Sequence, residues 1–132
     1  MSGGISSSED DAALQKRAVE IAKSLFRRVH IPSEEEEEEE SEITMTNLRN
    51  MLEAAIDCAE KDNWDLFGLR IVYLARNASQ GDDLYIFVKN LLTEIKNSAE
   101  SSKERLKLAQ YILKSCIYLF NAYRKGLSDL LG

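Results

Sequence analysis

Apolar residues recur at steps of three and four positions along most of the chain, which is the spacing of amphipathic α-helices. No stretch alternates apolar and polar residues as a half-buried strand does, so the pattern predicts an all-α fold. We expect a compact bundle of about five helices, over residues 10–30, 46–62, 64–78, 83–97 and 102–127. Residues 1–9, rich in Gly and Ser, are predicted to form a disordered tail, and residues 10–132 a single helical domain.

Two of the predicted helices carry more apolar residues than one buried face requires. Residues 64–78 are apolar over most of the helix circumference, which predicts a central position in the bundle. Residues 102–127 need partners on more than one side, so this helix either forms the centre of the bundle or meets another chain. Its apolar seam consists of Leu106, Ala109, Leu113, Cys116, Phe120, Tyr123, Leu127 and Leu130.

Local signals mark the ends of several helices. Ser101 and Glu104 have the spacing of a capping box, in which the hydroxyl caps the helix and the carboxylate reaches back. Thr44 or Thr46 can cap the second helix, and Pro32 ends the first. These signals support the helix boundaries independently of the apolar pattern.

An acidic segment at residues 33–42 interrupts the helical pattern. Its seven consecutive glutamates, Glu34 to Glu40, repel one another and have nothing to bury, which predicts a solvated loop. Together with Glu42 and the three acids of residues 9–11, they make up 11 of the 23 acidic residues. The other 12 acids face 17 Lys and Arg, so the net charge of −6 conceals a body of about +5.

The chain offers little material for catalysis or metal binding. Its single histidine, His30, stands at a predicted helix end, where a cation favours the helix dipole. Cys58 and Cys116 lie on apolar helix faces and are expected to be buried thiols. We therefore expect no enzyme activity, no metal site and no cofactor, in a cytoplasmic protein without a membrane span.

Basic residues follow the polar faces of two helices. Evenly spaced cations can track a phosphate backbone through charge alone, although ordinary solubilising lysines give the same pattern. The two stripes are Lys16, Lys23 and Arg27 in residues 10–30, and Lys103, Lys107 and Lys114 in residues 102–127.

Three arginines differ from these stripes because a guanidinium group can bind a phosphate through two hydrogen bonds. They are Arg49, Arg70 and Arg76. Arg70 and Arg76 stand in the most apolar predicted helix, so each needs either an acidic partner or an exposed ligand. The alternative to a phosphate contact is an internal ion pair with Glu53, Asp57 or Asp65.

Short motifs follow one another in a defined order along the chain. A Ser/Thr-x-Leu/Ile-Arg element opens a helix at residues 46–49, a Tyr-x-Ala/Gly-Arg element follows at 73–76, and a Leu-x-x-Phe element at 84–87. The last helix carries Tyr111, Tyr118 and Tyr123 before the basic finish Arg124, Lys125 and Gly126. In this order, over roughly residues 43–126, the chain resembles the small α-helical subunit of type III-A (Csm) CRISPR interference complexes.

The resemblance implies a non-catalytic subunit whose copies stack head to tail along the groove where guide RNA and target RNA pair. Its partners would be both RNAs, the other CRISPR effector subunits and copies of itself. The residues expected to hold the RNA backbone are Arg49, Arg70 and Arg76, and the stripe adds Lys107 and Lys114. The equivalent subunit of type III-B complexes has the same role with different partners. A helical protein–protein adaptor without RNA binding is the alternative function.

Overall fold

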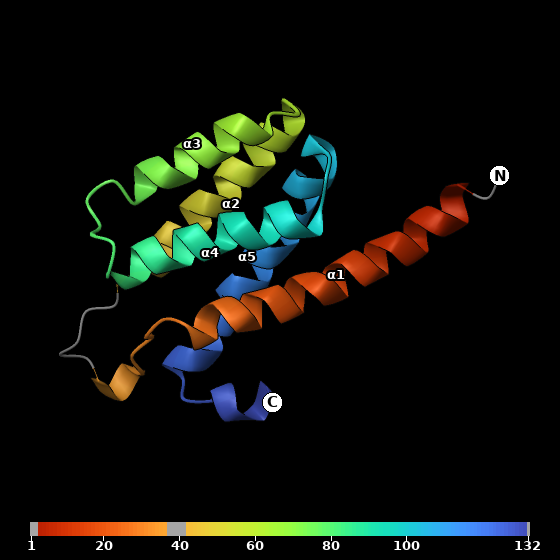
Figure 1. The fold of residues 1–132 in the computed structure, drawn as a ribbon. Helices are drawn as coiled ribbons and strands as arrows, with labels where there is room; N and C mark the ends of the chain where they lie inside the picture. Colours follow the sequence, from red (N-terminus) through yellow and green to blue (C-terminus); the bar gives the residue numbers. More distant parts are fainter. Residues whose placement is uncertain (1–2, 37–41, 132) are drawn as a thin grey trace.

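Five α-helices make up most of the computed structural model, which describes residues 3–36 and 42–131, with side chains over 11–35 and 42–131. They are α1 (Gly3–Arg27), α2 (Met45–Glu60), α3 (Trp64–Leu74), α4 (Asp83–Ser98) and α5 (Ser102–Arg124). Two short 3-10 helices accompany them, η1 (Glu34–Glu36) and η2 (Ser128–Leu131). The described residues contain no strand, which confirms the prediction of an all-α bundle (Figure 1).

The central helix of the bundle is α5. It packs mainly against α1 and α2 and also contacts α3 and α4, and it lies behind α4 in Figure 1. Of the two positions expected for this helix, it takes the centre of the bundle. The predicted seam is buried from Leu106 to Phe120 and joins the core formed by the other helices. Cys116 of this seam and Cys58 of α2 are both buried free thiols, as predicted.

The prediction that residues 64–78 form the central helix is wrong. Only Phe67 and Ile71 of α3 are buried, whereas Leu69 is 69% exposed and Val72 and Tyr73 are also exposed. The reason is that α3 is short and lies at the edge of the bundle, next to α2 in Figure 1. One side of α3 therefore meets the core while its other apolar side faces outward.

The caps explain where three helices begin. Thr44 caps α2 by accepting a hydrogen bond from the backbone N–H three residues later, at 3.0 Å. At the start of α5, the Ser101 hydroxyl accepts from the Glu104 N–H at 3.1 Å and lies 3.0 Å from the Glu104 carboxylate. Asn63 caps α3 in the same way as Thr44 caps α2.

The first and last helices differ from the prediction at their outer ends. α1 begins at Gly3 rather than at residue 10, and Figure 1 shows its first turns extending beyond the other helices. The disordered tail over residues 1–9 stays a prediction. α5 ends at Arg124 because Gly126 adopts a φ of 74°, a conformation that glycine accepts without strain. The seam therefore does not continue to Leu127 and Leu130, and Leu130 is 80% exposed.

An aromatic cluster joins the end of α1 to the rest of the bundle. The ring of Phe26 in α1 lies 6.0 Å from that of Phe87 in α4 and 5.4 Å from that of Tyr123 in α5. Both pairs meet edge to face, which is a favourable arrangement for aromatic rings. The Phe26 side chain is only 1% exposed, so it anchors α1 to α4 and α5.

Candidate nucleic-acid interface

The five residues predicted to bind RNA fall on two separate surfaces. Arg49 belongs to α2, Arg70 to α3 and Arg76 to the turn that follows α3. Lys107 and Lys114 belong to the outer side of α5. The three arginines thus belong to α2, α3 and the turn after α3, where α2 and α3 pack on each other, whereas the two lysines belong to α5.

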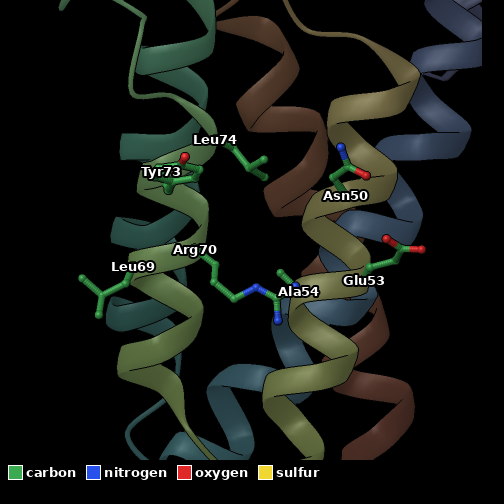
Figure 2. Close-up of a pocket in the computed structure, with 7 residues that line it drawn as sticks. All are labelled: Asn50, Glu53, Ala54, Leu69, Arg70, Tyr73 and Leu74. Atoms are coloured by element: carbon green, nitrogen blue, oxygen red, sulfur yellow. The ribbon is translucent and has the colours of Figure 1, made fainter.

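Arg70 forms an internal ion pair, the alternative that the sequence left open. Its Nη1 lies 2.7 Å from the Oδ2 of Asp57, which also binds Lys61 at 3.0 Å. The hydrogen bond from Lys61, and then that from Arg70, lower the pKa of Asp57. Figure 2 shows Arg70 reaching from α3 toward α2, where it lines a groove of about 340 Å³. Its charge is partly balanced, although its side chain remains 41% exposed.

Arg76 is held by the tyrosine of its own motif. Its Nη1 donates a hydrogen bond to the Tyr73 carbonyl at 3.0 Å, and its guanidinium carbon lies 4.1 Å from the centre of the Tyr73 ring. Arg76 was expected inside a helix, but α3 ends at Leu74, so it belongs to an exposed turn. The Tyr-x-Ala-Arg motif thus produces an exposed, preoriented guanidinium group whose charge no carboxylate in the described part of the chain balances.

Arg49 lies on the outward side of α2, one turn into the helix. Within residues 11–35 and 42–131 it has no hydrogen-bond or ion-pair partner. Leu48 before it is fully buried, so the motif fixes one residue in the core and presents the next to solvent. An exposed guanidinium without an internal partner is available to an external anion.

The exposed side of α5 carries a longer row of polar and aromatic residues than the sequence suggested. We call this row the α5 strip; it comprises Lys103, Lys107, Lys114, Tyr118 and Lys125. At 100° per residue these positions fall within about 60° of one another around the helix axis, over a length of about 33 Å. Tyr118 and Lys125 were not predicted as part of this row, although a step of four residues leads from Lys114 to Tyr118 and a further step of seven leads to Lys125.

Carboxylates of the chain itself neutralise two of the lysines. Asp11 of α1 lies 2.9 Å from the Nζ of Lys107 and accepts a hydrogen bond from the Tyr111 hydroxyl at 2.6 Å. That hydrogen bond, followed by the one from Lys107, lowers the pKa of Asp11. Near the other end, Glu34 pairs with Lys125 at 3.1 Å. Lys114, between them, has no ion-pair partner among the described residues.

The beginning of the acidic segment is fixed to the end of α5. Arg124 donates from Nη1 to the carbonyl oxygens of Pro32 at 2.8 Å and Ser33 at 3.2 Å. This contact holds Glu34 beside Lys125. The predicted loop over residues 33–42 begins in this way, while its residues 37–41 lie outside the described part of the chain.

The stripe predicted on the first helix does not form one open surface. Lys16 and Arg27 are exposed, but Lys23 is half-buried. Lys23 and Arg27 line a hollow together with Tyr123 and Asp129 from the C-terminal end of the chain. A continuous track for a phosphate backbone is therefore better developed on α5 than on α1.

The described residues also bear on two other classes of site. None of the five helices has an apolar stretch long enough to cross a bilayer, within residues 3–36 and 42–131. The same part of the chain contains no group of three His, Cys, Asp or Glu residues arranged to hold a metal ion. Comparison with known proteins gives no significant match to a protein-family model, a curated protein or a solved structure.

Proposed function

We propose that this chain is a non-catalytic small subunit of a type III CRISPR RNA-guided effector complex and holds RNA through its backbone. The observation that carries the proposal is that the arginines of the two motifs, Arg49 in α2 and Arg76 after α3, are both exposed. Arg49 has no internal partner in the described residues, and Arg76 is oriented by Tyr73 rather than neutralised by an acid. Both are in a position to donate to phosphate oxygens.

The type of contact supports a role that does not depend on RNA sequence. Guanidinium and ammonium groups on helix surfaces bind phosphate oxygens, which are the same for every base. Such binding weakens with salt: the logarithm of the binding constant falls with the logarithm of the salt concentration, with a slope of about 0.7–0.9 for each phosphate neutralised. Guide RNA, target RNA, further effector subunits and copies of the chain are the proposed partners, in the cytoplasm.

One feature favours the alternative of a protein–protein adaptor. Leu69, Val72 and Tyr73 form an exposed apolar ridge on α3. Leu69 borders grooves on both sides, one shared with α2 and one shared with α4. Exposed apolar residues that gather in this way are typical of protein-binding surfaces. In an effector complex the ridge would contact a neighbouring subunit, whereas an adaptor would use it without binding RNA.

The test compares arginine variants in the assembled complex. Arg49→Ala and Arg76→Ala should each weaken RNA retention. Each should also make the affinity for RNA less dependent on salt, by the amount expected for the loss of about one phosphate contact. Lys89→Ala is the matched control, because Lys89 is an exposed cation of α4 outside both surfaces. Circular dichroism of each variant shows whether the fold is kept.

The outcomes separate the alternatives. If both arginine variants fold and retain RNA as the wild type does, these arginines are not the RNA site. If the Lys89 variant weakens RNA binding as much as they do, only overall charge matters. A type III-B complex, rather than type III-A, would be recognised by the subunits that purify with the chain.

A further inference from the structure

Tyr118 is the most exposed aromatic residue among the large apolar side chains that face solvent, at 75%. Exposing a tyrosine ring to water is unfavourable compared with burying it, so a ligand that covers the ring would gain binding free energy. Its neighbours are not apolar: Lys114 precedes it by one helical turn and Lys125 follows by two. This setting differs from the ridge on α3, where the exposed residues adjoin one another and are apolar.

Other tyrosines of the bundle have internal roles that Tyr118 lacks. Tyr111 donates its hydroxyl hydrogen to Asp11, Tyr123 packs on Phe26, and the Tyr73 ring is covered by Arg76. Tyr118 has no hydrogen-bond, ring or cation partner among the described residues. Its ring is therefore available on the polar side of α5.

An aromatic ring between cations matches the chemistry of a single-stranded nucleic acid. The cations bind successive phosphates, while the ring stacks on a base that has left its own stack. In a duplex the bases are stacked and paired inside, so their faces are closed to a side chain on a protein surface. An exposed ring therefore favours unpaired nucleotides, whereas lysines alone do not distinguish the two forms.

We infer that the α5 strip binds single-stranded RNA and that Tyr118 stacks on one of its unpaired bases. The inference rests on the proposed function, because it assigns a form of RNA to one of the two surfaces. Lys114, the lysine nearest to Tyr118 on the strip, supplies the phosphate contact next to the stacked base. Lys107 and Lys125 extend the track on either side once RNA displaces Asp11 and Glu34.

The experiment measures the affinity of the full chain for three probes. They are a short unstructured RNA, the same RNA paired with its complement, and inorganic polyphosphate, which carries charge without bases. Tyr118→Ala should weaken binding of the single strand by about 5- to 140-fold, the range given by stacking of one base at ~1–3 kcal/mol. Its affinity for the duplex and for polyphosphate should change by less than about twofold, the size of a neutral surface substitution.

Three control variants accompany Tyr118→Ala. Tyr118→Phe keeps the stacking face and should keep the affinity for the single strand. Leu130→Ala removes an equally exposed apolar side chain outside the strip and should have no effect. Lys114→Ala should weaken the binding of all three probes, because each of them carries phosphate groups.

Each other result has a definite meaning. Stacking is refuted if Tyr118→Ala weakens the binding of all three probes equally. It is also refuted if Tyr118→Ala leaves all three affinities unchanged while Lys114→Ala lowers them. In both cases the backbone-binding proposal survives. If the wild-type chain binds no probe, the α5 strip is not an RNA site, whereas the proposed function is still decided by the arginine variants in the assembled complex. If Tyr118→Ala instead releases a protein from the purified complex while RNA is retained, the ring is a protein contact and the inference is overturned.

Discussion

Replacing Phe26 by alanine tests how firmly α1 is attached to the bundle. The Phe26 ring is 1% exposed and meets the rings of Phe87 and Tyr123 at 6.0 and 5.4 Å. Truncating a buried phenylalanine to alanine costs about 3–5 kcal/mol, which combines lost burial with the cavity left behind. This is a large share of the ~5–15 kcal/mol by which domains of this kind are stable.

Phe26→Leu separates the aromatic contribution from burial. Leucine keeps most of the apolar volume but loses both edge-to-face pairs, each worth about 0.5–1.5 kcal/mol. We therefore expect a loss of about 1–3 kcal/mol for Phe26→Leu, clearly less than for Phe26→Ala. Val19→Ala is the control on the same helix, because Val19 is 39% exposed and its truncation should cost less than about 1 kcal/mol.

The assay is urea denaturation followed by circular dichroism, with the free energy of unfolding taken from each transition. A loss of less than about 1 kcal/mol for Phe26→Ala would contradict a buried junction between α1, α4 and α5. Equal losses for the alanine and leucine variants would show that the ring pairs, and not burial, account for the effect.

Three other features of the structure lead to measurable outcomes. Burial raises the pKa of the Cys116 thiol, so it should react with a thiol reagent only after unfolding; rapid reaction of the native protein would contradict its position. The Tyr111 hydrogen bond lowers the pKa of Asp11 below 3.8, so the resulting stabilisation is full above that value and is lost as pH falls through the lowered pKa. Tyr111→Phe should raise the pKa of Asp11 in an NMR titration, and an unchanged pKa would mean that the contact does not form. Glu34→Gln should release Lys125 and raise the affinity for RNA. The slope of log affinity against log salt concentration should become steeper by up to about 0.7. An unchanged affinity would show that this ion pair does not compete with RNA.

The sequence predicted the helices well because both signals that define them are local. Apolar spacing located all five α-helices, and the Ser101–Glu104 capping box marked the start of α5. The end of α5 was placed too late because Leu127 and Leu130 continue the three-and-four spacing past the helix. Gly126, which ends the helix through its backbone conformation, was read only as part of a motif.

The arrangement of the helices was harder to predict because it depends on distant contacts. Composition pointed to residues 64–78 as the centre, yet α3 lies at the edge with Leu69 facing outward. A helix that is apolar all round is usually buried, but the rule does not apply when a chain presents an apolar surface outward. α5 became the centre because its buried side is long and continuous.

The candidate site could be predicted in its members but not in its geometry. The sequence singled out Arg70 and gave Asp57 as one of three possible partners, and only the packing of α3 on α2 selects that pair. The role of Tyr73 beneath Arg76 was hidden because α3 was expected to continue to residue 78. The contacts of Asp11 and Glu34 with α5 join residues about 90 or more positions apart, which no local pattern reveals.

The proposal of a CRISPR effector subunit is tested most directly by purifying the tagged chain from its native cells. Mass spectrometry would identify the proteins retained, and sequencing would identify the RNA. We predict guide RNA together with several larger CRISPR effector subunits. Recovery of one unrelated protein partner without RNA would contradict the proposal and would favour the adaptor, with the apolar ridge of α3 as its binding surface.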